Sequence, residues 1–180
     1  ADDCIDVSNT ADFGFTTADF TVEAWMNFTS TAQQSLFDFR TVATENKVWL
    51  YATPTNNKII LYVNGSNIAE LTGISLSTWH HVALTRQAGV GRLFLDGVLS
   101  TTFSFSQNLG ATTPCRIGAR YDLIGTNEFS GYMDGIRFSS TAKYTSAFTP
   151  GNMINTTDTV LMIDAEDGIV DNTNLYMDTN

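Results

Sequence analysis

The stretch "WHHVALTRQAGVGRLFLDGVL", residues 79–99, decides the fold class. In its first part Val82 and Leu84 alternate with His81 and Ala83, which is the period of two expected for a β-strand. Asp96-Gly97 then separates two further alternating runs, and an Asp-Gly pair readily adopts the positive φ angles of a type I′ hairpin. The stretch therefore predicts antiparallel strands joined by tight turns.

The same signals recur along the chain. Asn64-Gly65 predicts a second hairpin between two alternating runs, and we count about twelve short strands with no window of helical period. Apolar residues make up 43% of the chain and charged residues only 16%. This composition, with its many Thr, Ser and Asn residues, is typical of an all-β sandwich or barrel. Residues 20–28 are expected to split by face, with Phe20, Val22, Ala24 and Met26 on one side and Thr21, Glu23, Trp25 and Asn27 on the other.

The charge excludes some classes of partner. At a net charge of −10, phosphate backbones and anionic lipid surfaces are repelled, so we expect no nucleic acid partner. No apolar run approaches the roughly 18 residues of a membrane span, so we expect no membrane insertion. An acidic protein rich in Thr and Asn suits a virion or an extracellular or cell surface.

The two adjacent histidines raise the question of a metal or catalytic site. His80 and His81 point to opposite faces of a strand, so they are not expected to share one metal. Spacing leaves a Ser–His–Asp triad open, because triads assemble in space. We favour structural roles for both histidines, with Glu23 as a cross-strand partner of His81 on a neighbouring strand.

The two cysteines, Cys4 and Cys115, match no metal-binding pattern. Each lies in strand-like sequence, so a disulfide would be possible if the two strands were neighbours. We favour the alternative of two buried free thiols.

Six motifs in order carry a family resemblance: "DFTVEAW", "WHHVALTR", "LFLDG", "IG", "GYMDGIRFS" and "AKYTSAFTP". Together they resemble the laminin-G-like branch of the concanavalin A-like lectin/glucanase superfamily, of the type found in phage structural and bacterial surface proteins. The resemblance implies a two-sheet antiparallel jelly-roll sandwich over residues 1–150. Residues 151–180 would be a linker plus a closing strand, or the start of a following repeat in a longer polypeptide.

The superfamily also contains glucanases, and similar enzymes carry an ExDxxE strand that supplies the two catalytic carboxylates. No such motif is present. The nearest carboxylate cluster contains Asp164 and Glu166. We therefore predict that the protein is not an enzyme and has no catalytic residues, with a glycoside hydrolase as the minor alternative.

The most ligand-like stretch is residues 120–132. Tyr121 and Tyr132 offer flat faces for stacking on sugars, and Asp122, Asn127 and Glu128 offer hydrogen-bonding groups. No cofactor is required by the sequence, but calcium is a possible one, because these same three residues could supply hard oxygen ligands.

A second aromatic candidate is the pair Trp49 and Tyr51, which share one strand face as a stacking platform or as core packing. Trp25 is expected on an outer sheet face.

These features predict a non-catalytic adhesion or recognition module that binds glycan, on a virion as a fibre or capsid-decorating protein. The alternative is a purely structural module that contacts neighbouring subunits in an oligomeric virion or cell-surface assembly.

Overall fold

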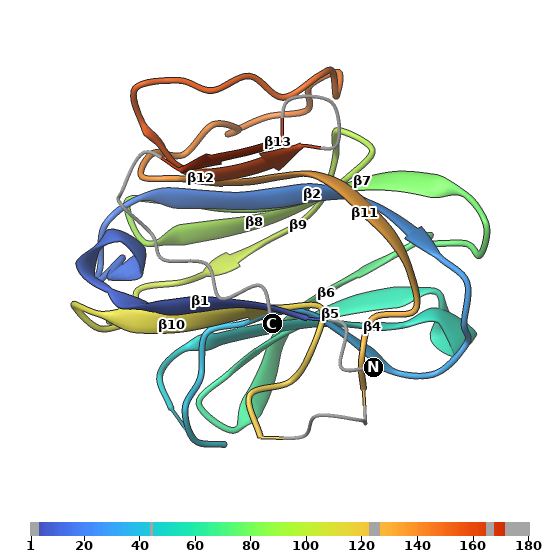
Figure 1. Ribbon diagram of the computed structural model, residues 1–180, viewed down its shortest axis with the longest axis horizontal. Coiled ribbons are helices and arrows are strands. Elements are labelled where there is room, and N and C mark those ends of the chain that lie inside the picture. The colour runs from blue at the N-terminus through green and yellow to red at the C-terminus, as the bar shows by residue number, and fades with distance from the viewer. Residues whose placement is uncertain (1–3, 44, 123–126, 165–167, 172–180) are drawn as a thin grey trace.

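The computed structural model describes residues 4–43, 45–122, 127–164 and 168–171, and it has two β-sheets stacked face to face (Figure 1). All pairs of named neighbouring strands are antiparallel. The predicted two-sheet antiparallel jelly-roll sandwich is therefore confirmed. The six-stranded sheet has the order β1 (Ile5–Thr10), β10 (Thr113–Ile117), β3 (Gln34–Asp38), β4 (Val48–Thr53), β5 (Lys58–Val63), β6 (Ser66–Thr72). The seven-stranded sheet has the order β13 (Gly168–Asp171), β12 (Thr159–Asp164), β11 (Gly131–Ser139), β2 (Phe20–Phe28), β7 (Trp79–Gln87), β8 (Val90–Leu95), β9 (Val98–Ser104).

Helical structure in the described residues is limited to two short 3-10 turns, η1 (Ala11–Phe13) and η2 (Pro54–Asn56). Neither these nor any other described segment forms a helix long and apolar enough to cross a membrane.

The core lies between the sheets and follows the predicted alternation. Phe20, Val22, Ala24 and Met26 of β2 are fully buried in one apolar cluster that draws on both sheets. Aromatic rings join the layers there: the Phe37 ring on β3 lies 5.4 Å from the Phe138 ring on β11, edge to face. The residues between them along β2 point to the outer face of the seven-stranded sheet.

Among the described residues, three hairpins have positive φ at both turn residues, as type I′ turns require. Two were expected, Asn64-Gly65 between β5 and β6 and Asp96-Gly97 between β8 and β9. The third is Ala88-Gly89 between β7 and β8. Sequence analysis missed it because Ala, unlike Asn or Asp, rarely adopts positive φ.

The segment after β11, residues 140–155, covers part of the outer face of the seven-stranded sheet, and we call it the strap. It follows β11 in orange in Figure 1. Tyr144 and Phe148 stack with their rings 3.5 Å apart, and Phe148 packs edge-on against His81 and Phe94. Thr85 Oγ1 donates to the Tyr144 carbonyl oxygen at 2.9 Å. The motif "AKYTSAFTP" is thus a structural cover for this sheet.

The strand predicted near the end of the chain, β12, pairs with β11 in the register Ile136–Ile163. It therefore adds to the same seven-stranded sheet as β2 and β7. Residues 165–167 and 172–180, which include Glu166, lie outside the described residues.

Cys4 and Cys115 are not joined by a disulfide. Cys4 directly precedes β1, which pairs with the strand of Cys115, but Cys115 lies opposite Val7. Cys4 is three residues further along, about 10 Å at strand spacing, which is beyond the reach of a disulfide. Burial raises the pKa of the Cys115 thiol well above its usual value, so this cysteine remains an apolar thiol in the core.

Candidate functional site

An open pocket lies on the outer face of the seven-stranded sheet. Strand register brings its lining together: Tyr132, Asn27 and Trp79 pair across β11, β2 and β7, and Asp134, Trp25 and His81 form the next row. Trp79, Asp134 and Trp25 of these two rows line the pocket. Residues paired across antiparallel strands project from the same face. Side chains that are far apart in the sequence therefore gather at one place.

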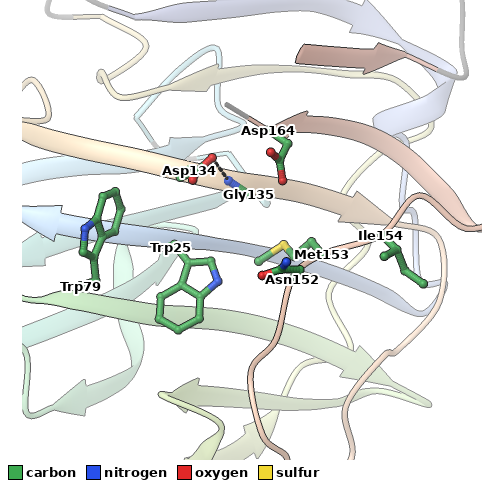
Figure 2. A pocket seen from close by; sticks show the side chains of 8 residues that line it. All are labelled: Trp25, Trp79, Asp134, Gly135, Asn152, Met153, Ile154 and Asp164. Atoms are coloured by element: carbon green, nitrogen blue, oxygen red, sulfur yellow. Dashed lines mark hydrogen bonds between the residues drawn. The ribbon is translucent and has the colours of Figure 1, made fainter. Parts of the chain in front are cut away.

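The pocket has a volume of about 460 Å³. Its walls combine two indoles, two carboxylates and an amide. Figure 2 shows Trp25 near the centre, with Trp79 on one side, Asp134 and Asp164 above, and Asn152 on the other side. Trp79 is 44% exposed, which is unusual for so large an apolar side chain. The lining residues are Trp25, Trp79, Asp134, Gly135, Asn152, Met153, Ile154 and Asp164.

A β-bulge in β11 shapes the floor. The pairing with β2 shifts between Asp134 and Arg137, and Gly135 has a φ of +54°. A β-carbon at Gly135 would lie 3.4 Å from the Trp25 ring and 3.6 Å from Met153. The bulge thus lets the backbone approach the indole closely and interrupts the strand where the pocket opens.

One wall of the pocket is held by a buried ion pair. Arg137 Nη2 and Nε donate to Glu23 Oε1 at 2.6 and 2.8 Å. The same guanidinium donates through Nη1 to the Ile154 carbonyl oxygen and through Nη2 to the Tyr144 hydroxyl. Because Ile154 lines the pocket, this arginine connects the sheet, the strap and the pocket wall.

The environment of Glu23 keeps it ionised. Burial alone raises its pKa, but His81 and the Arg137 guanidinium act in the other direction and outweigh it, so the pKa of Glu23 is lowered. His81 Nε2 lies 3.1 Å from Glu23 Oε2. The predicted His81–Glu23 pair is thus confirmed, and Arg137 is the partner that sequence analysis did not find. Burial, with a smaller contribution from the Glu23 charge, raises the pKa of the Tyr144 hydroxyl above its usual range.

The other histidine belongs to a Ser–His–Asp chain at the far side of the same strand. His80 Nδ1 is 2.9 Å from Asp96 Oδ2, and its Nε2 is 3.0 Å from Ser75 Oγ. The Ser75 backbone N–H also donates to this Nε2, at 3.1 Å. The backbone N–H therefore competes with the Ser75 hydroxyl for the Nε2 lone pair, which a general base must offer to the serine hydroxyl. Asp96 Oδ1 accepts from the His81 backbone N–H, so the chain joins a loop to the hairpin tip.

The outer face of the six-stranded sheet also carries aromatic residues, but they are covered. Trp49 and Tyr51 stack with ring centroids 4.2 Å apart, and both are buried. The Arg40 guanidinium lies 4.4 Å over the Trp49 ring and forms two hydrogen bonds to Asp38. The pair predicted as a platform is thus on an outer face, beneath an arginine.

Two of the predicted ligand-binding residues adjoin this covered cluster. The Tyr121 ring lies 5.0 Å from the Arg40 guanidinium, and the Tyr121 backbone N–H donates to Asp38 Oδ2. Asp122 is within 2.8 Å of Arg120 Nε. A carboxylate held by a guanidinium is less available to another ligand.

The other three predicted residues lie elsewhere. The Asn127 carbonyl oxygen accepts from Ser35 N–H, beside β3 of the six-stranded sheet. Glu128 lines a groove together with residues of both sheets, among them Ile5, Ile117 and Ile163. Tyr132 lies on β11, 65% exposed, one row from the Trp25 pocket.

Calcium binding by Asp122, Asn127 and Glu128 stays a prediction. Residues 123–126, which connect them, lie outside the described residues. In the ranges that are described, no three His, Cys, Asp or Glu side chains form a group suited to a metal ion.

Sequence analysis missed the pocket itself. It placed Trp25 on an outer face and singled out Asp164, but Trp79 and Asp134 were not recognised as their neighbours. Alternation alone gives the face of each residue, so a Trp that alternates with core positions was the available signal. Which outer residues meet depends on strand order and register, which one sequence does not specify.

Comparisons with known proteins bear on the fold. A family model described as the concanavalin A-like lectin/glucanases superfamily matches residues 2–146. The structure is similar to a candidate carbohydrate-binding protein from Bacteroides ovatus, with 18% identity and a TM-score of 0.60 over 97% of this chain. This chain spans only 57% of that one. No curated protein matches the sequence.

Two further solved structures share the fold. A heptameric pentraxin from Limulus polyphemus has 16% identity and a TM-score of 0.61, over 97% of this chain and 87% of its own. A sialidase-associated carbohydrate-binding module from Ruminococcus gnavus, solved with sialyllactose, has 18% identity and a TM-score of 0.52, over 65% of this chain and 73% of its own. At these identities the likeness shows the fold alone.

Proposed function

Because the chain belongs to the concanavalin A-like lectin/glucanase superfamily, we propose that it is a non-catalytic module that binds glycan at the Trp25–Trp79 pocket. One observation carries the proposal: two indoles, one of them 44% exposed, lie in an open pocket beside two carboxylates and an amide. Sugars present apolar C–H faces and a rim of hydroxyls. An aromatic face and planar polar groups complement both.

Each wall has a role in binding. Trp79 and Trp25 would stack on sugar rings, and Asp134, Asp164 and Asn152 would accept or donate hydrogen bonds at the hydroxyls. The exposed Tyr132 would extend the aromatic surface along β11 to a further sugar unit. An open pocket of this size predicts a dissociation constant on the order of 0.1–1 mM for one sugar, so useful adhesion would require many copies.

The setting we propose is the surface of a virion or a cell, where many copies are displayed. The net charge of −10 supports this, because it disfavours nucleic acid and anionic lipid as partners. The resemblance of "AKYTSAFTP" to phage structural and bacterial surface proteins supports it as well.

The test is a glycan array followed by calorimetric titration of the best oligosaccharide. Trp79→Ala should abolish measurable binding, since it removes the exposed stacking face. Tyr121→Ala is the matched aromatic control at the other candidate site and should leave affinity unchanged. Loss of binding in the Tyr121 variant alone would move the site to residues 120–132. Release of reducing ends during the titration would contradict the non-catalytic assignment.

If no glycan on the array is bound, with or without calcium, the structural alternative is favoured. In that case the aromatic surface would contact a neighbouring subunit, and Trp79→Ala should lower the stability of the assembled particle instead.

A further inference from the structure

We propose that the Trp25–Trp79 pocket selects glycans that carry a free, protonated amino group. This inference rests on the proposed function and specifies its ligand class. It follows from the balance of charges at the pocket and from the aromatic faces beside them.

Both charged residues of the lining are acidic. Asp134 comes from β11 and Asp164 from the end of β12, and Figure 2 shows both above the Trp25 ring. Across the described part of the chain, no Lys or Arg contributes to the pocket lining. The pocket is therefore an anionic concavity on a protein whose net charge is already −10. It disfavours carboxylated or sulfated sugars and attracts a cation.

Two cations on the elements around the pocket, Arg137 and Lys143, are already engaged. Arg137 is buried, and its guanidinium is shared among Glu23, the Ile154 carbonyl and the Tyr144 hydroxyl. Lys143, on the strap, donates to Asp158 at 2.5 Å and to Thr156 at 2.9 Å. Turning either side chain toward the pocket would break these contacts. Neither cation lines the pocket, whose charged residues are the two aspartates.

The aromatic residues favour the same ligand. An ammonium group over the face of an indole gains cation–π attraction, and Trp is the strongest of the aromatic side chains in this respect. An ammonium has three N–H donors, which two carboxylates can accept together. A glucosamine-type sugar thus offers a ring face to one indole and a cation to Asp134 and Asp164. N-acetylation would remove the charge and leave only the ring face.

The experiment compares three oligosaccharide probes of equal length at about pH 6, where the sugar amine is protonated. These are oligomers of glucosamine, of N-acetylglucosamine and of glucose. A charge-assisted hydrogen bond contributes about 1.5–3 kcal/mol, so the glucosamine oligomer should bind at least about tenfold more tightly than the other two. The advantage should shrink when salt is raised.

Two variants locate the preference. Asp134→Asn and Asp164→Asn should each lower the affinity for the glucosamine oligomer by a larger factor than the affinity for the uncharged oligomers, because the amide keeps a hydrogen-bonding group but removes the charge. Asp12→Asn makes the same charge change in η1, on an exposed residue outside the pocket, and should alter nothing. If the Asp12 variant loses as much affinity as the pocket variants, the attraction comes from net charge and the inference is wrong.

The failure of this inference is separable from the failure of the proposed function. Equal affinity for all three oligomers, abolished by Trp79→Ala, would keep the glycan site and overturn the amino-sugar preference. Tighter binding of sialyllactose than of glucosamine oligomers would overturn it as well. No binding of any glycan would overturn both.

Discussion

The two outer faces of the sandwich carry similar residues, but they differ in whether their aromatic side chains are accessible. Each carries aromatic residues and a buried arginine paired with a carboxylate, Arg40 with Asp38 on one face and Arg137 with Glu23 on the other. On the six-stranded sheet the arginine lies over the aromatic rings. On the seven-stranded sheet it lies under the strap, and the indoles beside it remain open to a ligand.

The difference shows that the position of a nearby cation decides whether an aromatic side chain is accessible to a ligand. The guanidinium stacked on Trp49 makes a cation–π contact with the ring face and occupies the space that a sugar would need. Arg137 is directed at backbone and hydroxyl groups instead, so it supports the wall of the pocket without occupying it. The first face is a stability element, and the second is a candidate binding surface.

The largest expected effect concerns the two arginines. Arg40→Ala and Arg137→Ala should each lower the free energy of unfolding by about 3–5 kcal/mol, because each leaves a buried carboxylate without its partner. Urea denaturation measures both. Only the Arg137 variant should also weaken glycan binding, through the released Ile154 wall. If the Arg137→Ala variant does not fold, Arg137→Lys keeps a charge at this position and tests whether glycan binding is weakened there and not at Arg40. Equal binding losses in both variants would end the distinction between the faces.

The next effect separates the tryptophans by stability. Trp49 is 6% exposed and Trp79 is 44% exposed. Trp49→Ala should cost about 3 kcal/mol or more, as expected for truncating a buried aromatic, whereas Trp79→Ala should cost about 1 kcal/mol or less. Thermal denaturation of the two variants provides the comparison. A larger loss for Trp79 would mean that this side chain is a packing element.

Two hairpin glycines test how tightly the strap holds its face. Gly65 and Gly97 have nearly the same φ, +81° and +76°. A β-carbon at Gly65 meets nothing within 4 Å, but one at Gly97 would come within 2.0 Å of the Phe148 carbonyl oxygen. Gly65→Ala should cost about 1 kcal/mol from backbone strain alone. Gly97→Ala should cost about 1–2 kcal/mol more, because the strap must shift. Equal denaturation midpoints would mean that the strap yields freely at Phe148.

The smallest expected effect is a change in how the free energy of unfolding depends on pH. The pKa of Glu23 is lowered in the folded protein, so its charge stabilises the fold above the unfolded value of about 4.5. This contribution is lost as the pH falls through the folded pKa. Glu23→Gln should lower stability at neutral pH and flatten the fall in stability as the pH drops below about 4.5. Asp158, whose pKa is also lowered, keeps part of the acid sensitivity in this variant. An unchanged slope would assign the acid sensitivity to other carboxylates.

Alternation and turn residues predicted an all-β sandwich or barrel because each of these signals is local, and the family resemblance then implied the jelly-roll sandwich. The faces of residues 20–28 follow from a strand of period two, and the Asn64-Gly65 and Asp96-Gly97 hairpins follow from their turn residues. The pocket does not, because Trp25, Trp79 and Asp134 meet only through the order β11-β2-β7. Loop composition drew attention to residues 120–132, where Asp122 is paired with Arg120. Neither charge pairing nor strand order is a property of composition.

The most direct test of the two-face account uses the three tryptophans, since each gives one indole N–H signal in a ¹H–¹⁵N NMR spectrum. The protein is titrated with the oligosaccharide that binds best on the array. The signals of Trp25 and Trp79 should shift in proportion to saturation, while Trp49, whose Nε1 donates to Ser35 Oγ beneath Arg40, should stay in place. A shift of the Trp49 signal, with Trp25 and Trp79 unmoved, would place the ligand on the six-stranded sheet and contradict the account.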